Sequence, residues 1–77
     1  MFVTERNAAP LLRVLGIDPG TLRTGWGIIE RTGRTVSFRA AGVITPKGFH
    51  SLPERLRVIH AGIVEIIQTY APQVLSL

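Results

Sequence analysis

Several sequence features that define common protein classes are absent from these 77 residues. It contains no cysteine, which excludes a disulfide scaffold, a thiolate zinc site and a cysteine nucleophile, and which fits the reducing cytoplasm. No apolar run approaches the roughly 18 residues of a membrane span. Residues 1–10 lack the apolar core of a signal peptide, and we expect them to form a loosely ordered leader. We therefore expect a cytoplasmic protein without a membrane segment.

Charged residues are scarce, and acidic residues are the scarcer kind. Only 18% of the residues are charged while 45% are hydrophobic, and a chain this short buries only about 60% of its unfolded surface. We expect an uncovered apolar face, which calls for a partner or for more chain, so that the 77 residues form the front part of something larger. Nine basic residues against five acidic ones give a net charge of +4, which favours a nucleic-acid partner over a membrane.

The first half of the sequence is typical of three consecutive strands. Strands are predicted over residues 11–17, 25–30 and 35–45. The first is apolar almost throughout, as a strand covered on both faces would be. Residues 31–34 form a hairpin turn in which Gly33 supplies a positive φ, and the small residues 40–42 suggest a β-bulge. The result is an antiparallel meander.

The second half predicts a helix and a further strand. Ser51 and Glu54 have the spacing of a capping box, and Pro72 ends the helix. An apolar stripe, which we assign to the core, contains Leu52, Leu56, Ile59, Ile63, Ile66 and Tyr70. His60 lies just off the stripe and is interpreted as a boundary residue, since no second ligand is in register with it.

A fourth strand begins at residues 74–77. A strand reached through a helix is normally parallel to an earlier strand and joined to it by a right-handed crossover, so we place it beside the first strand. The fold class is α/β, with a three-stranded meander, a helix and a parallel fourth strand. An acid just beyond Leu77 would then face Asp18.

Asp18 is the strongest candidate for a functional residue, because it ends the first strand beside a Pro-Gly turn. It has two explanations. An Asp at a turn accepts a hydrogen bond from the backbone two residues on, and from the tripeptide alone this is the simpler interpretation. A carboxylate on a rigid strand also suits Mg²⁺ bound against phosphate oxygens. Nearby, Gly25 and Gly27 share one sheet face, either leaving room for a ligand or accommodating Trp26.

Longer motifs carry a family resemblance. The segments are VLGIDPG (14–20), TGWGIIE (24–30), GVI (42–44), LPERL (52–56) and YAP (70–72). In order and spacing they resemble the opening of the RuvC family of Holliday-junction resolvases, over residues 12–77. The resemblance implies a ribonuclease H-like fold, with residues 11–77 as the N-terminal portion of a single nuclease domain.

That resemblance also implies a function. Family members are Mg²⁺-dependent endonucleases that work as homodimers, cut two opposed strands of a four-way DNA junction, and act with the RuvA and RuvB branch-migration proteins. Their catalytic set is four acidic positions, the last sometimes His, and the first falls on Asp18. Asp18 would bridge two metal ions, and this implication reverses the turn-only interpretation. The DNA-contacting residues are not indicated.

The sequence departs from the family pattern in its acids. The second family acid is expected directly after Leu77 and the other two lie further on, while none of the remaining carboxylates matches them: Glu5, Glu30, Glu54 and Glu65. The family's later helices, which cover the sheet and build the dimer contact, are missing as well. We expect the 77 residues by themselves to be inactive as a nuclease.

Two alternatives stay open. Sugar kinases and actin-like ATPases also begin with an apolar strand, Gly-Ile-Asp and a Gly-Thr turn, although Pro19 and the LPERL segment argue against them. ATP binding without DNA binding would favour that class. If the natural chain ended at Leu77, it would be a non-catalytic remnant with an interaction role or none.

Overall fold

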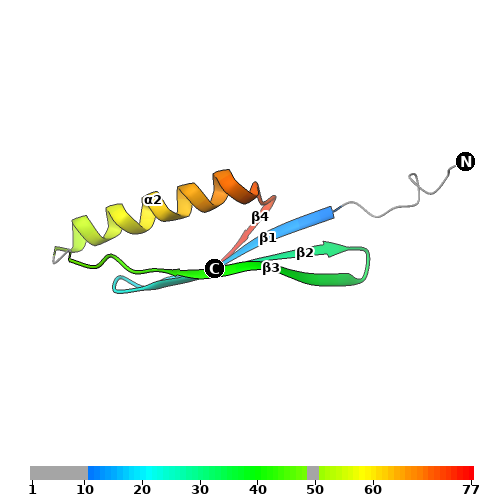
Figure 1. Cartoon of the computed structure of the whole chain (residues 1–77), viewed down its shortest axis with the longest axis horizontal. Coiled ribbons are helices and arrows are strands. Elements are labelled where there is room, and N and C mark those ends of the chain that lie inside the picture. The colour runs from blue at the N-terminus through cyan, green and yellow to red at the C-terminus, as the bar shows by residue number, and fades with distance from the viewer. Residues whose placement is uncertain (1–10, 49–50) are drawn as a thin grey trace, which may run out of the picture.

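The structure is a computed structural model that describes residues 11–48 and 51–77. The predicted leader and the end of the loop after the third strand lie outside these residues. The described elements are β1 (Leu11–Asp18), β2 (Thr24–Thr32), β3 (Thr35–Ile44), α2 (Leu52–Tyr70) and β4 (Val74–Ser76). They form one sheet in the order β3-β2-β1-β4, with α2 along one face of it (Figure 1).

The predicted topology is confirmed. β1 to β3 are antiparallel neighbours, and β4 pairs in parallel with β1. β1 is therefore an internal strand, in which Leu15 lies between Ile28 of β2 and Leu75 of β4. The prediction that β1 is covered on both faces is not met by the described residues, because α2 covers only one face: Leu15 and Ile17 are buried there, whereas Leu11 is 46% exposed.

The β2–β3 hairpin differs in detail from its prediction. Its turn is tighter, because Thr32 pairs with Thr35 and Gly33 has φ 63°, so β2 runs beyond the predicted residues 25–30. The predicted bulge at residues 40–42 is wrong by one residue: Ile28 pairs with Ala40 and Ile29 with Phe38, which leaves Arg39 as the extra residue.

The small residue at position 42 serves packing instead of a bulge. An ideal Cβ built on Gly42 would lie 2.8 Å from Nε1 of Trp26, so the indole occupies the space that a larger side chain would need. Trp26 in turn packs against the core and against the ring of Tyr70, with ring centroids 6.0 Å apart. Gly42 therefore leaves room for Trp26 to pack against Tyr70, with the two rings tilted by 45° to each other.

The ends of α2 are set as predicted. The Glu54 N–H donates to Ser51 Oγ at 3.2 Å, and the Ser51 N–H donates to Glu54 Oε1 at 3.4 Å. This reciprocal pair satisfies donors that the first helical turn leaves without partners. At the other end Ala71 adopts a left-handed φ of 47°, and its N–H bonds the carbonyl of Ile67 before Pro72 turns the chain away.

The core lies between α2 and one face of the sheet. Its buried cluster contains Leu15, Ile17, Ile28 and Ile66, and Ile59 of α2 is buried as well. The prediction that the whole helix stripe is core is wrong for Leu52 and Leu56, which are 46% and 48% exposed. Leu56 instead lines an apolar groove of about 470 Å³ between the first half of α2 and the turn after β1. His60 is exposed, in agreement with its placement off the stripe.

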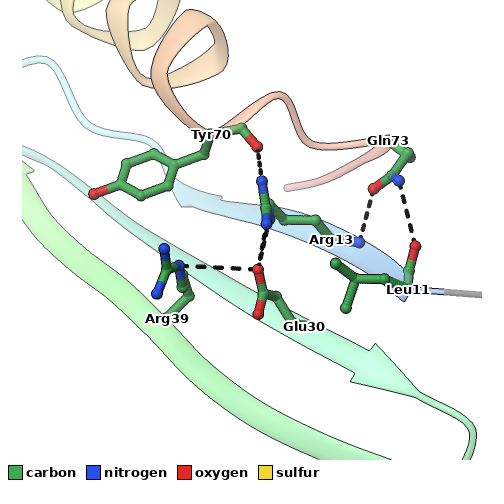
Figure 2. A network of polar contacts seen from close by, with 6 residues as sticks. All are labelled: Leu11, Arg13, Glu30, Arg39, Tyr70 and Gln73. Carbon is green, nitrogen blue, oxygen red and sulfur yellow. Dashed lines mark hydrogen bonds and ion pairs between the residues drawn. The ribbon is translucent and has the colours of Figure 1, made fainter.

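A polar network attaches the end of α2 to the sheet (Figure 2). Arg13 of β1 forms an ion pair with Glu30 of β2 at 2.6 Å and also donates to the backbone carbonyl of Tyr70. Arg39 approaches the same Glu30 carboxylate at 3.9 Å. The Glu30 carboxylate is thus paired mainly with Arg13 within the fold, and its side chain is only 18% exposed.

Gln73 aligns β4 with β1. Its side-chain carbonyl accepts from the Arg13 N–H at 2.8 Å, its own N–H donates to the Arg13 carbonyl at 3.0 Å, and its amide group reaches the Leu11 carbonyl at 3.4 Å. β4 has three residues, all exposed, so packing alone specifies its register weakly. The Gln73 bonds therefore help to set the register in which β4 pairs directly with β1.

The face of the sheet opposite α2 is apolar and uncovered by any described element. Its exposed members include Ile29, Val36, Phe38, Val43 and Val74, of which Phe38 is 72% exposed. This confirms the expectation of an uncovered apolar face. The one described helix, α2, lacks the combination of length and apolarity that a membrane crossing requires.

Candidate functional site

Asp18 is the last residue of β1 and is paired with Gly25 of β2. Leu15 and Ile17 point into the core beneath α2, and successive side chains of a strand alternate between its faces. Asp18 therefore belongs to the opposite, uncovered face, where it is exposed. The hydrogen-bonded strands on both sides of β1 fix the backbone that carries it.

The turn after Asp18 is held by a different residue. The Thr24 hydroxyl donates to the Gly20 carbonyl at 2.8 Å and accepts from the Gly20 N–H at 3.4 Å. An ideal Cβ on Gly20 would collide with the backbone oxygen of Arg23, so the close return of the chain requires glycine there. Within the part of the chain that the structure describes, the Asp18 carboxylate has no hydrogen bond or ion pair. The turn-chemistry explanation of Asp18 is thus not supported.

Thr24 was not predicted to matter, and its role can be tested. Its side chain is 1% exposed and makes both bonds across the turn. We expect Thr24→Val, which keeps the shape and removes the hydroxyl, to lower the free energy of unfolding by about 1–2 kcal/mol. Urea denaturation of the intact protein measures this. Thr21→Val, at an exposed position of the same turn, is the matched control and should change stability by less than about 0.5 kcal/mol. Equal effects would contradict the role of Thr24.

Glycines surround Asp18 on the uncovered face. Gly16, Gly25 and Gly27 share this face, and ideal Cβ atoms built on them would meet no heavy atom nearer than 3.8 Å. Together with Ser76 of β4 they line an open depression of about 480 Å³ beside Asp18. The predicted room at Gly25 and Gly27 is therefore present, and the alternative of accommodating Trp26 is fulfilled by Gly42 on the other face.

The ligands that the site offers to a metal are few. Asp18 supplies hard carboxylate oxygens, which suit Mg²⁺. In residues 11–48 and 51–77 no group of three His, Cys, Asp or Glu side chains is close enough to hold an ion. Glu30 belongs to the Arg13 network, and Glu54 caps α2. Asp18 alone offers too few ligands for a metal ion, and a metal site here would need further acids.

Comparison with known proteins identifies a family and relatives that this chain resembles in sequence. Residues 14–77 match the family described as "Crossover junction endodeoxyribonuclease RuvC". Proteins of that name from Methylorubrum extorquens and Sinorhizobium medicae are 47% and 45% identical, over 86% and 80% of this chain. The chain spans 35% and 37% of those relatives, about a third of their length.

Solved structures share the fold. The chain matches the Thermus thermophilus RuvC structure determined in complex with a Holliday junction substrate, with a TM-score of 0.72 and 25% identity over 83% of this chain and 40% of that one. The Aquifex aeolicus PPX-GPPA enzyme matches with a TM-score of 0.64 over 86% of this chain and 25% of that one. At 14% identity this second likeness extends to the fold alone.

Proposed function

The chain belongs to the RuvC family of crossover junction endodeoxyribonucleases, and from this premise we propose that it forms part of a metal-dependent endonuclease that resolves four-way DNA junctions. The sheet order, with β4 parallel to β1 beneath one helix, is the ribonuclease H-like arrangement. The net charge of +4 suits a polyanionic substrate.

One observation carries the proposal: the Asp18 carboxylate is exposed, has no partner in the described structure, and lies on a glycine-lined depression. A carboxylate used for structure would be expected to bond the turn that follows it, and Thr24 does this instead. The internal position of β1 fixes Asp18 in place, as a metal ligand requires. We therefore propose Asp18 as a catalytic metal ligand.

The chain's own residues have defined roles in this chemistry. We propose two Mg²⁺ ions per site, which when bound would supply an activated water and stabilise the leaving oxygen in phosphodiester hydrolysis. Asp18 would hold the ions, while Gly16, Gly25 and Gly27 let a phosphodiester backbone approach the strand. Gly16 pairs with Ser76 in the parallel register of β1 and β4. If β4 continued in this register, Leu77 would pair with Ile17, and the position after Leu77 would lie beside Asp18. An acid there would complete a facing pair.

The partners we propose follow from the family and from the uncovered sheet. We propose that the protein acts as a homodimer, because a resolvase must cut two opposed strands, and that it works with the RuvA and RuvB proteins. The uncovered face with Ile29, Val36 and Phe38 calls for further protein to cover it. We propose the cytoplasm as the site of action.

A cleavage assay tests the proposal. The intact protein is incubated with a four-way junction and with a linear duplex of the same sequence, with Mg²⁺ or with EDTA. We expect paired cuts in opposed strands of the junction, only with Mg²⁺, and at least about tenfold slower cleavage of the duplex. Equal cutting of both substrates, or cutting in EDTA, would contradict the proposal. ATP binding without junction binding would favour the kinase-like alternative.

A further inference from the structure

The backbone N–H of Gly20 is a hydrogen-bond donor within reach of two side chains in the turn after β1. An aspartate in a turn accepts a hydrogen bond from the N–H two residues on, and for Asp18 that group belongs to Gly20. Pro19, between them, has no N–H to offer. In the structure the Gly20 N–H instead donates to Oγ1 of Thr24, at 3.4 Å. Thr24 therefore occupies the donor that an aspartate turn would use.

Thr24 holds this donor on the side of the sheet away from Asp18. Gly25 pairs with Asp18, and Thr24 precedes Gly25 in β2, so the Thr24 side chain belongs to the opposite face, beneath α2. Thr24 is 1% exposed there and lines the same groove as Gly20. Its hydroxyl also donates to the Gly20 carbonyl at 2.8 Å. Because Thr24 bonds both backbone groups of Gly20, it opposes a rotation that would turn the N–H toward Asp18.

A hydrogen bond from Gly20 to Asp18 would compete with a metal ion for the carboxylate. Hydrogen bonds to an ionised acceptor are stronger than those between neutral groups, so a Gly20 N–H released by Thr24 would favour Asp18 as its acceptor. A metal ion would then have to displace that bond before it could bind. With the Thr24 hydroxyl in place, the Asp18 carboxylate carries no hydrogen bond from any described residue and is ready to bind a metal ion.

We propose that Thr24 is a positioning residue for Asp18: its hydroxyl holds the Gly20 N–H beneath the sheet and so keeps the Asp18 carboxylate free for a metal ion. The inference rests on the proposed function and adds to it a buried residue that acts through Asp18 without contacting the metal. One oxygen must both donate to the Gly20 carbonyl and accept from the Gly20 N–H. A serine hydroxyl can do this, whereas a valine methyl group cannot.

The test is Mg²⁺ binding by the intact protein without DNA, measured by isothermal titration calorimetry. Thr24→Val should weaken Mg²⁺ binding about tenfold, because the carboxylate must first release the Gly20 N–H. Thr24→Ser, which keeps the hydroxyl, should bind Mg²⁺ within about twofold of the parent. Junction cleavage by Thr24→Val should need about tenfold more Mg²⁺ for its half-maximal rate and should come within about twofold of the parent rate at saturating Mg²⁺.

Amide hydrogen exchange at Gly20 gives a second readout, which a purely structural role of Thr24 would not change in this way. In Thr24→Val the Gly20 N–H should be protected by Asp18 and should lose that protection when Mg²⁺ is added. In the parent the N–H is bonded to Thr24, so its protection should not depend on Mg²⁺.

Controls separate the possible outcomes. Thr21→Val, at an exposed position of the same turn, should bind Mg²⁺ as the parent does. Thermal unfolding shows whether the variants fold, and Thr24→Ala, which also lacks the hydroxyl, replaces Thr24→Val if the latter does not. The inference is overturned, while the proposed function stands, by parent-like Mg²⁺ affinity in the variant without the hydroxyl, by an equal loss in Thr24→Ser, or by Gly20 exchange in that variant that ignores Mg²⁺. Absence of Mg²⁺ binding by the parent would overturn both.

Discussion

Asp18→Asn is expected to abolish Mg²⁺-dependent junction cleavage, lowering its rate by about 10³-fold or more. The amide has nearly the same shape as the carboxylate but lacks the negative charge that would offset the two Mg²⁺ ions proposed for the site. The Asp18 side chain is exposed and forms no hydrogen bond or ion pair with the described residues, so the substitution should leave the fold intact. The measurement is the single-turnover rate of strand cleavage.

Junction binding separates a catalytic role for Asp18 from a binding role. In EDTA the variant should bind the junction with largely the parent affinity and the same salt slope, since phosphate contacts made by basic residues dominate binding. Glu65→Gln, an exposed acid on α2, is the matched control and should cleave at the parent rate. Parent-like cleavage by Asp18→Asn would remove Asp18 from the mechanism.

Leu15→Ala is expected to produce the largest loss of stability, about 2–5 kcal/mol in the free energy of unfolding. Leu15 is 0% exposed and lies at the centre of β1, between Ile28 and Leu75. Truncation removes buried methyl groups and leaves a cavity that the hydrogen-bonded strands cannot close. Because Asp18 is three residues further along the same strand, the loss also loosens the support of the site.

Urea denaturation of the intact protein measures this effect, as a lower midpoint at an unchanged m-value. Leu22→Ala is the matched control, because Leu22 is 69% exposed in the turn after β1 and its truncation should cost less than about 0.5 kcal/mol. If the two variants lost equal stability, the core assigned to Leu15 would be wrong.

The elements of the fold could be predicted because their signals are local. Ser51 and Glu54 are three residues apart, and Gly33 sets the hairpin turn by its own backbone conformation. Such interactions form within a few residues, so their sequence pattern is sufficient. The bulge was misplaced by one residue because the small residues at 40–42 and the extra Arg39 are adjacent, and only cross-strand pairing decides between them.

The candidate site was predictable in its position but not in its chemistry. The apolar run of β1 indicates where Asp18 lies, at the end of a strand. Asp18 and Thr24 both flank the turn, and both side chains are able to bond its backbone. Only the folded geometry shows that Thr24 makes these bonds and that Asp18 is free of them.

The sequence by itself determined the strands, the helix and the acid at the end of the central strand, since each depends on short-range periodicity and turn chemistry. Only the tertiary structure decided which side chains connect these elements to one another. Arg13 meets Glu30 across 17 residues, and Gln73 meets Arg13 across 60, so that β4 is aligned beside β1. Such pairs carry no local pattern, because their energy depends on a register and a crossover that exist only once the chain has folded.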